Sequence, residues 1–269
     1  SMMRFNFIRV ITITSCLLLA ATVGCARAAT AVYEPVINQS GKDVVWVPTP
    51  LELVEEMLNM AKVTSSDYVM DLGSGDGGIV IAAARRGATA LGIEYNPDMV
   101  AYARQAADKA GVTAKASFEK ADLFETDFSK ATVITMFLLP EINLKLRPKI
   151  LDLKPGTRIV SNSFDMGDWK PDQTTELPDI ASAWDTAYLW IVPAKVDGIW
   201  SFDKGTINFN QEFQEITGKL NLGQEVDISG SLNGNTITFT AGGRNYTGTV
   251  NGNAIIGTHD GGGAWRAAR

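Results

Sequence analysis

Three acidic side chains and a glycine-rich segment carry the strongest chemical signal in the sequence. Asp71, Glu94 and Asp122 each stand at or just after the end of a short apolar run that predicts a β-strand. Residues 73–78, Gly-Ser-Gly-Asp-Gly-Gly, follow the first of these runs at once. Glycines directly after a strand let the backbone turn tightly and approach a ligand where a side chain would collide with it. The pattern predicts a ligand site at the carboxyl ends of the strands.

The charges of these residues narrow the choice of ligand. A carboxylate at Asp71 disfavours a nearby pyrophosphate by repulsion and suits a ligand with a cationic amino group. Glu94 stands where an acidic side chain can bind both ribose hydroxyls, and Asp122 stands where a carboxylate can meet an adenine amino group. Together the three acids predict a site for S-adenosylmethionine. Two alternatives are a nicotinamide cofactor and a solvated edge whose acids bind nothing.

The elements that must position these residues alternate between helices and strands. Thr49, Pro50 and Glu52 predict a helix start, with Thr49 as N-cap and Glu52 closing a capping box. Helices are expected at 51–61, 79–86 and 97–110, and strands at 67–72, 89–93, 116–119, 133–138, 157–161 and 186–192. Strand, helix and strand at this spacing predict a parallel, doubly wound α/β sheet of the Rossmann-like type.

The composition changes near residue 195. All ten prolines lie at or before Pro193, whereas residues 196–269 hold 14 of the 25 glycines. Alternating apolar and polar residues with Asn-Gly turns predict about eight short strands between 199 and 267, enough for a small antiparallel β-barrel. We therefore expect one domain at 29–195 and a second at 196–269. Trp200 and the pair Trp265-Arg266 resemble a lipocalin-like closure in which an arginine covers a tryptophan, and the barrel is either packed and ligand-free or a binding module.

Residues 1–28 have the pattern of a signal peptide. Arg4 and Arg9 precede the mostly apolar stretch 10–24, and small residues at 26–28 suit cleavage. The pattern predicts export, as to a periplasm. Cys25 leaves a lipidated variant open, so a membrane contact is expected only through a leader that is retained or lipidated.

The remaining composition excludes several classes of site. Residues 29–269 carry 21 basic and 30 acidic side chains, so a basic surface for nucleic acid is not expected. Both cysteines lie in the first 28 residues, and His259 is the single histidine. After residue 28, a cysteine nucleophile, a Ser-His-Asp triad and a multi-histidine metal site are therefore not expected. No metal is predicted.

The run Asp71-Leu72-Gly73-Ser74-Gly75-Asp76-Gly77 resembles the first motif of class I methyltransferases. Further segments make the chain similar to the lysine methyltransferases that modify the ATP synthase c subunit, and to their broad-specificity prokaryotic relatives. The matching segments lie within residues 44–170, about half of the chain, and are 47–50, 71–77, 92–97, 137–140 and 153–158. The chain departs from the pattern at Gly78, where these relatives usually carry arginine.

The resemblance implies a seven-stranded sheet, S-adenosylmethionine as methyl donor and a lysine of a protein substrate as acceptor. It also implies where the donor lies: the methionine end at the segment from Asp71 to Gly75, the ribose near Glu94, the adenine at Asp122, and a flank at Thr49. The cofactor-binding residues that we predict are Thr49, Asp71, Gly73, Ser74, Gly75, Glu94, Tyr95, Asn96, Asp122 and Leu123.

The acceptor side is expected at the end of the fourth strand, in Phe137-Leu138-Leu139-Pro140-Glu141. Backbone carbonyls of Leu138 and Leu139 can hold an amine, and Glu141 can attract a lysine. We name Phe137, Leu138, Pro140 and Glu141 as candidate catalytic residues.

Alternatives remain open on the acceptor side. The apolar residues of this segment can be core, and Glu141 can be a helix-start acid favoured by the helix dipole. Trp169 fits either a lid or a surface packing residue. A small-molecule methyltransferase and an exported S-adenosylmethionine-binding protein without turnover are the two alternative functions.

Overall fold

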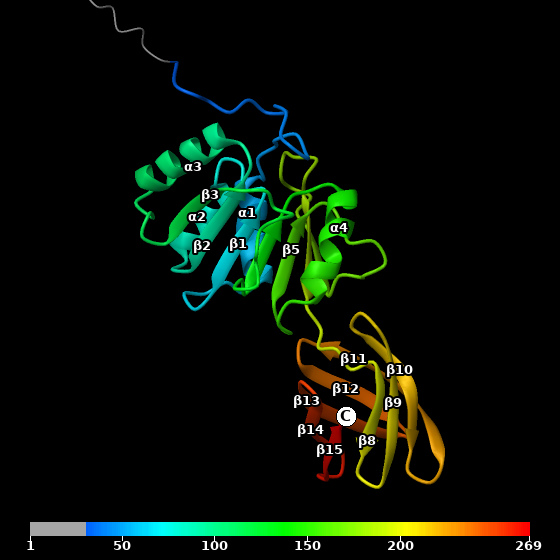
Figure 1. Ribbon diagram of the computed structural model, residues 1–269. Helices are drawn as coiled ribbons and strands as arrows, with labels where there is room; N and C mark the ends of the chain where they lie inside the picture. The colour runs from blue at the N-terminus through cyan, green and yellow to red at the C-terminus, as the bar shows by residue number, and fades with distance from the viewer. Residues whose placement is uncertain (1–30) are drawn as a thin grey trace, which may run out of the picture. The chain divides into compact units, whose positions relative to one another are not determined.

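A computed structural model describes residues 31–269, in which a mixed sheet with helices is followed by a closed barrel (Figure 1). The predicted leader, residues 1–28, lies outside the described residues. The helices are α1 (Leu51–Met60), α2 (Gly78–Arg85), α3 (Pro97–Lys109) and α4 (Pro140–Leu151). The sheet strands are β1 (Tyr68–Leu72), β2 (Thr89–Glu94), β3 (Ala116–Lys120), β4 (Val133–Met136), β5 (Arg158–Asn162), β6 (Gln173–Glu176) and β7 (Thr186–Ile191).

The seven strands form one sheet in the order β3-β2-β1-β4-β5-β7-β6. The expected seven-stranded, doubly wound sheet is confirmed, but the expectation that it is all parallel is wrong. Strand β7 runs antiparallel to both β5 and β6. Strand β6 is not predicted from the sequence, because its four residues, Gln-Thr-Thr-Glu, contain no apolar side chain and lie on the surface. The connection from β6 to β7 contains no helix, so these two strands pair as an antiparallel hairpin at the edge of the sheet.

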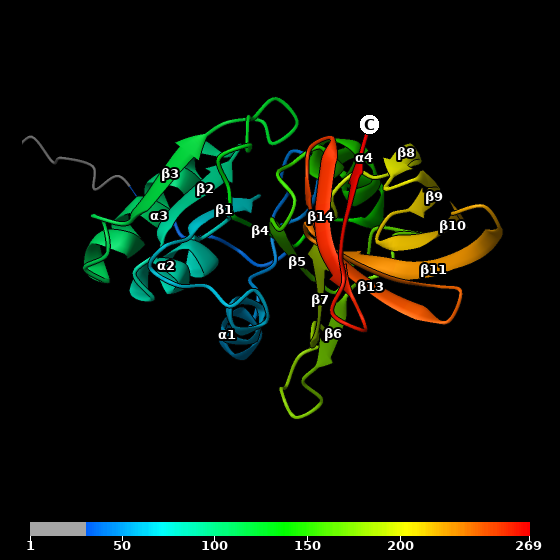
Figure 2. The same ribbon diagram turned by 90° about the horizontal axis from the view of Figure 1, so that it is seen from below.

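Helices cover both faces of the sheet (Figure 2), and the apolar side chains form two cores. On one face, Val69 of β1 packs with apolar residues of α1, α2 and α3. On the other face, Met70 and Leu72 of β1 pack with apolar residues of α4. Since successive strand residues point to opposite faces, Asp71 lies on the same face as Val69. The sheet is therefore covered on both sides, and a carboxylate of its central strand is enclosed.

Helix α1 begins differently from the prediction. Its N-cap is Pro50, and no side chain among the described residues caps it. The Thr49 hydroxyl instead accepts a hydrogen bond from Asn162 Nδ2 at 3.2 Å, which ties the entrance of α1 to the end of β5. The predicted capping box is therefore wrong, because a partner distant in sequence uses the threonine oxygen.

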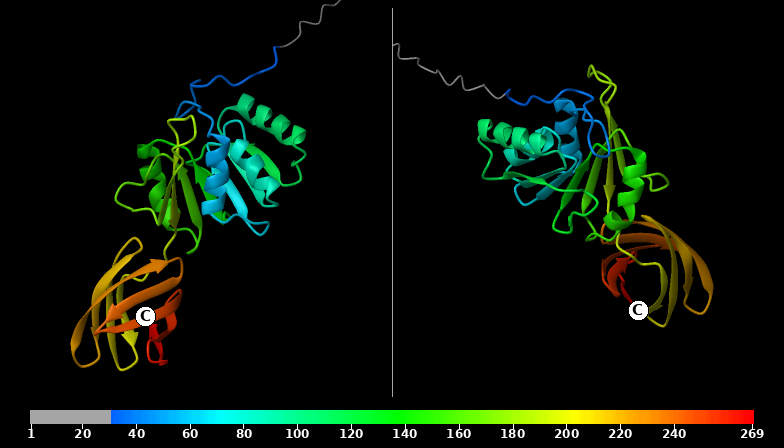
Figure 3. Two further views of the ribbon diagram at one scale, coloured as in Figure 1. Left: turned by 180° about the vertical axis from the view of Figure 1, so that it is seen from behind. Right: turned by 45° about the horizontal axis from the view of Figure 1, so that its top comes forward.

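Eight antiparallel strands close into a barrel (Figure 3), as expected from the alternation and the Asn-Gly turns. They are β8 (Gly198–Phe202), β9 (Gly205–Glu212), β10 (Glu215–Asn221), β11 (Glu225–Asn233), β12 (Thr236–Ala241), β13 (Arg244–Asn251), β14 (Ala254–His259) and β15 (Ala264–Ala268). Arg269, and not Arg266, covers Trp200: its guanidinium lies 4.4 Å from the centre of the indole. Sheet and barrel belong to one compact unit, Tyr33–Arg269, and the domain boundary at residue 195 stays a prediction.

Two features are absent from residues 31–269. No helix in this part of the chain has the length and apolarity to cross a bilayer. The same residues contain no group of three or more histidine, cysteine, aspartate or glutamate side chains placed to hold a metal ion.

Candidate active site

The glycine loop between β1 and α2 turns through conformations that only glycine adopts readily. Gly73, Gly75 and Gly77 have φ angles of 80°, 52° and 84°. A Cβ atom added to Gly75 would lie 2.5 Å from Nε1 of Trp46, so the indole approaches the bare backbone. Gly78, in contrast, has room for a side chain, because an added Cβ would meet Asp76 at an ordinary 3.5 Å. The departure from the family pattern at Gly78 is therefore not a steric requirement of this loop.

Asp71 is a buried carboxylate that no cation of residues 31–269 pairs with. Its side chain accepts a hydrogen bond of 2.7 Å from the Thr135 hydroxyl, the residue opposite it on β4. Burial raises the pKa of the Asp71 carboxyl to about 7, although the hydrogen bond from Thr135 acts to lower it. The nearby charges of Asp76 and Glu94 add to the rise. A ligand with an ammonium group would offset burial and both repulsions, because an opposite charge favours the ionised carboxylate.

Asp67, at the other end of β1, is buried in a different environment. Arg158 forms an ion pair with it, and Thr132 donates a second hydrogen bond at 2.8 Å. Burial acts to raise the pKa of Asp67, yet these partners, with the Thr64 amide, hold it below the usual range. The described part of the fold thus supplies a cation to Asp67 and none to Asp71. The predicted pairing of Asp71 with the amino group of S-adenosylmethionine stays a prediction.

Glu94 fixes the glycine loop. One carboxylate oxygen accepts the Gly75 amide at 2.9 Å, and the other accepts the Asn96 amide at 2.9 Å. The Asn96 side chain in turn caps α3 by accepting the Asp98 amide at 2.9 Å. Since a carboxylate offers about four acceptor positions, Glu94 retains capacity for the two ribose hydroxyls predicted to bind there.

The adenine end of the predicted site is closed by a strap, residues 33–49. Lys42 of the strap donates to Asp122 at 2.7 Å, and its ammonium lies 5.3 Å from the ring centre of Tyr95. The hydrogen bond from Lys42 is the main reason that the pKa of Asp122 lies below its usual range. The other oxygen of Asp122 accepts the Phe124 amide. An adenine amino group that binds Asp122 as predicted would therefore share its carboxylate with Lys42.

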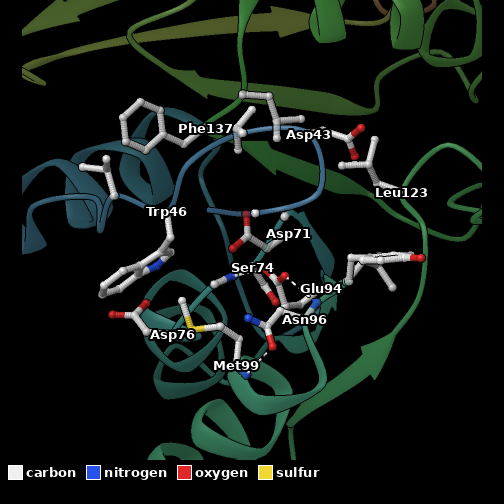
Figure 4. Close-up of a pocket in the computed structure, with 18 of the residues that line it drawn as sticks. Asp43, Trp46, Asp71, Ser74, Asp76, Glu94, Asn96, Met99, Leu123 and Phe137 are labelled. Atoms are coloured by element: carbon white, nitrogen blue, oxygen red, sulfur yellow. Dashed lines mark hydrogen bonds between the residues drawn. The ribbon is translucent and has the colours of Figure 1, made fainter. Parts of the chain in front are cut away.

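One cavity joins these pieces (Figure 4). Its volume is about 120 Å³, and it is lined by the strap, the glycine loop, Glu94 and the segment 121–123. Every predicted cofactor-binding residue lines it: Thr49, Asp71, Gly73, Ser74, Gly75, Glu94, Tyr95, Asn96, Asp122 and Leu123. Their roles in donor binding stay predictions. The sequence marks residues 47–50 as a family motif. It does not predict that Lys42 and Trp46 line the site, because their positions depend on contacts with residues far along the chain.

A second cavity, of about 370 Å³, lies next to the first and shares Phe137, Leu138 and several strap residues with it. Phe137 and Leu138 thus line both cavities, and their role on the acceptor side stays a prediction. Pro140 and Glu141 open α4 instead, with Glu141 exposed in the first turn. Phe164 and Trp184 complete the wall of the second cavity, and neither carries a motif that would identify it in the sequence.

Trp169 takes no part in either cavity. Both interpretations of this residue, as a lid and as a surface packing residue, are wrong. Its side chain is fully buried, with its ring stacked on Phe213 at 5.8 Å and tilted against Trp190 at 6.1 Å. Trp169 is therefore a core residue.

The chain is similar to known methyltransferases. The family model of the ANTKMT methyltransferase domain matches residues 71–173. A protein-lysine N-methyltransferase of Saccharolobus islandicus (strain REY15A) is 43% identical over 55% of this chain and 94% of its own length. The human lysine N-methyltransferase of the ATP synthase c subunit is 31% identical over 68% of this chain and 72% of its own length.

A solved structure adds evidence for the cofactor. An RNA methyltransferase from Salinibacter ruber, solved with S-adenosyl-L-homocysteine, is 50% identical over 56% of this chain and 96% of its own, with a TM-score of 0.53. The cavity, its buried carboxylate and these similarities agree on one donor. The chain belongs to the same family as the protein-lysine N-methyltransferases and the lysine N-methyltransferases of the ATP synthase c subunit, and it is an S-adenosylmethionine-dependent methyltransferase.

Proposed function

We propose that the protein transfers a methyl group from S-adenosylmethionine to the side-chain nitrogen of a lysine in a protein substrate. The observation that carries the proposal is the second cavity, which is mostly apolar and adjoins the donor cavity at Phe137 and Leu138. Such a cavity fits a long alkyl chain that ends in an amine. The names of the curated relatives support the same acceptor.

Methyl transfer requires the protein to hold the donor and the acceptor in line. The lysine ammonium first loses a proton to water. The lone pair of the neutral amine then forms a bond to the methyl carbon while the bond from that carbon to the sulfonium sulfur breaks, and S-adenosylhomocysteine leaves. Holding both reactants in line removes much of the entropic barrier of a bimolecular reaction. Phe137 and Leu138 separate the two cavities, so they set the distance and direction of the acceptor. The Asp43 carboxylate lines both cavities, but it lies 3.6 Å from the Lys42 ammonium, which lines them too.

Charge favours lysine over RNA as the acceptor. The chain carries a formal net charge of −6. Asp165 and Asp185 directly follow Phe164 and Trp184, which line the second cavity. Asp43 and Lys42 also line it and pair with each other at 3.6 Å. Phosphate groups need clustered lysine and arginine for binding, whereas a lysine ammonium is attracted by carboxylates.

A labelling experiment tests the acceptor. The protein is incubated with radiolabelled S-adenosylmethionine and one of three substrates: a lysine-rich unfolded protein, the same protein with every lysine blocked by acetylation, or RNA of random sequence. We expect label only in the unblocked protein, and mass spectrometry should place the added methyl groups on lysine.

Each other outcome identifies an alternative. Label in RNA would contradict the proposal and favour the activity named for the Salinibacter ruber relative. Label in the blocked protein would point to another side chain. Binding of S-adenosylmethionine by calorimetry, with no transfer to any of the three, would favour an exported binding protein without turnover.

We further propose that residues 1–28 export the chain. The basic residues followed by an apolar stretch support this proposal. A reporter that is active only outside the cytoplasm, fused after Arg269, should be active. An inactive export reporter together with an active cytoplasmic reporter at the same position would contradict it.

A further inference from the structure

We propose that Phe137, Phe164 and Trp184 form an aromatic wall that binds the acceptor lysine and prefers its ammonium in methylated form. The inference rests on the proposed function, because it assigns the residues that select the acceptor at that site. It adds a binding preference that can be measured without turnover.

The three rings lie in contact although they come from three separate segments. The ring centres of Phe137 and Trp184 are 5.4 Å apart, those of Phe164 and Trp184 are 5.9 Å apart, and those of Phe137 and Phe164 are 6.2 Å apart. Phe137 follows β4, Phe164 follows β5, and Trp184 lies in the connection between β6 and β7. All three line the second cavity. Since Phe137 also lines the donor cavity, the wall begins at the point where methyl transfer would occur.

The backbone next to Phe164 is strained, and hydrogen bonds hold it in place. The preceding residue, Ser163, has a φ angle of 65°, in the left-handed region that non-glycine residues rarely adopt. The Phe164 carbonyl accepts hydrogen bonds from Ser161 Oγ at 2.6 Å and from the buried Asn143 Nδ2 at 3.3 Å. Asn143 also donates to the Asp165 carbonyl at 2.9 Å. Strained residues that several neighbours hold in place are found at functional sites, among other places.

Trp184 is held from both sides of its loop. Its amide donates to Ser182 Oγ at 3.0 Å. The Leu177 amide donates to the Asp185 carbonyl at 2.8 Å, which closes the base of the loop. The indole is only partly buried and faces the cavity, so it is available to a ligand.

The chemistry of the wall determines what it binds. The faces of aromatic rings attract cations, and quaternary ammonium groups suit them best because such groups are bulky and weakly hydrated. Each methyl group added to an amine removes an N–H donor and adds apolar surface. A site made of carboxylates alone would lose hydrogen bonds at each step, whereas ring faces lose nothing. Asp43, on the strap that lines the same cavity, already pairs with Lys42 at 3.6 Å, so the ring faces are the groups that bind the positive charge.

Binding measurements with three peptides test the wall. The peptides share one sequence and carry at one position lysine, trimethyl-lysine, or the uncharged carbon isostere of trimethyl-lysine. Calorimetry is performed with the full chain saturated with S-adenosylhomocysteine. We expect the trimethyl-lysine peptide to bind more tightly than both others. Phe164→Leu and Trp184→Leu should each weaken its binding roughly 2- to 30-fold, the range of a lost cation–ring contact.

Two controls separate recognition from folding. Trp184→Phe keeps a ring and should retain most of the affinity. Tyr102→Leu makes the same kind of change on α3, where Tyr102 contacts Tyr33 outside the second cavity, and should leave peptide binding unchanged. Affinity for S-adenosylhomocysteine should stay within about twofold in all four variants, since none of the substituted residues lines the donor cavity.

Three results would overturn the inference. They are equal affinity for trimethyl-lysine and its uncharged isostere, unchanged peptide binding in both leucine variants, and a parallel loss of S-adenosylhomocysteine binding, which would give the rings a purely structural role. If lysine is methylated but any of these results appears, the proposed function stands and the wall is wrong. If the trimethyl-lysine peptide binds as expected but no lysine is methylated, the wall stands and the proposed function is wrong.

Discussion

The sheet and the barrel bury polar groups in opposite ways. Nine polar or charged side chains within residues 31–269 are buried, and eight of them lie before residue 163, in the part that forms the sheet and its helices. The barrel encloses rings instead: Phe239 lies 4.8 Å from Tyr246 and 5.6 Å from both Phe209 and Trp265, between ring centres. Buried polar groups cost free energy unless they are partnered.

The difference shows where the protein maintains a ligand site. Within residues 31–269, Asp71 has no cation beside it, and Ser74 Oγ, at the glycine loop, is buried without a hydrogen-bond partner. In the barrel, alternation places apolar side chains inside and polar ones outside, which stabilises the fold without preparing a comparable site. We therefore expect changes in the barrel to alter stability and changes at the glycine loop to alter donor binding.

The largest effect is expected from Phe239→Ala. Removing this buried ring from the barrel core should lower the free energy of unfolding by about 3–5 kcal/mol. Chemical denaturation measures the change. Below the unfolding transition, calorimetry should show unchanged affinity for S-adenosylmethionine. Weaker donor binding by protein that is still folded would mean that barrel and donor site are coupled.

Asp71→Asn tests the donor site with a substitution of nearly the same shape. Removing the charge should weaken S-adenosylmethionine binding by about 1.5–3 kcal/mol, the scale of a hydrogen bond to a charged group. The matched control is Asp98→Asn, because Asp98 is an exposed acid at the start of α3. Equal binding by the two variants would remove Asp71 from the donor site.

The same carboxyl should make donor binding depend on pH. With a pKa of about 7, Asp71 is mostly protonated at pH 6, and pairing with the donor's amino group requires its proton to leave. Affinity should rise roughly 16-fold between pH 5.5 and 7, or about 1.6 kcal/mol. Calorimetry in two buffers of different ionisation enthalpy should detect the released proton. Asp71→Asn should abolish both effects, and a pH dependence that survives in this variant would assign them to another group.

Stability without donor should change in the opposite direction. Because the pKa of Asp71 in the folded state lies above its ordinary value of 3.8, the folded state holds this proton more tightly than the unfolded state does. The resulting contribution to stability is complete below about pH 4 and is lost as the pH rises through 7. Comparing the denaturation of wild type and Asp71→Asn from pH 5 to 8 isolates the contribution. A difference between the two proteins that stays constant over this range would contradict the assignment.

The smallest effect is expected from Arg269→Ala. Arg269 is exposed, but its guanidinium covers Trp200 and donates to the carbonyls of Lys195 and Asp197 at 2.9 and 2.7 Å. Its loss should lower the free energy of unfolding by about 0.5–1 kcal/mol, the value of an exposed cation–ring contact. Arg266→Ala is the control. An equal effect in both variants would mean that the covering contact contributes nothing specific.

Local features of the protein could be predicted from the amino-acid sequence. Asp71, the glycine loop and Glu94 could be placed because each adjoins a strand whose apolar run is readable, and the carboxyl ends of parallel strands share one edge. The eight barrel strands were readable for the same reason, since alternation with period two is a local property.

Contacts between distant segments follow only from the tertiary structure. The pairing of Thr135 with Asp71 depends on the register of β1 and β4, and Lys42 reaches Asp122 across 80 residues of chain. Phe137, Phe164 and Trp184 meet because β4 and β5 end side by side, and β7, antiparallel to β5, begins at the same edge. No local pattern encodes such meetings, because the packing of the whole sheet determines which side chains share a cavity.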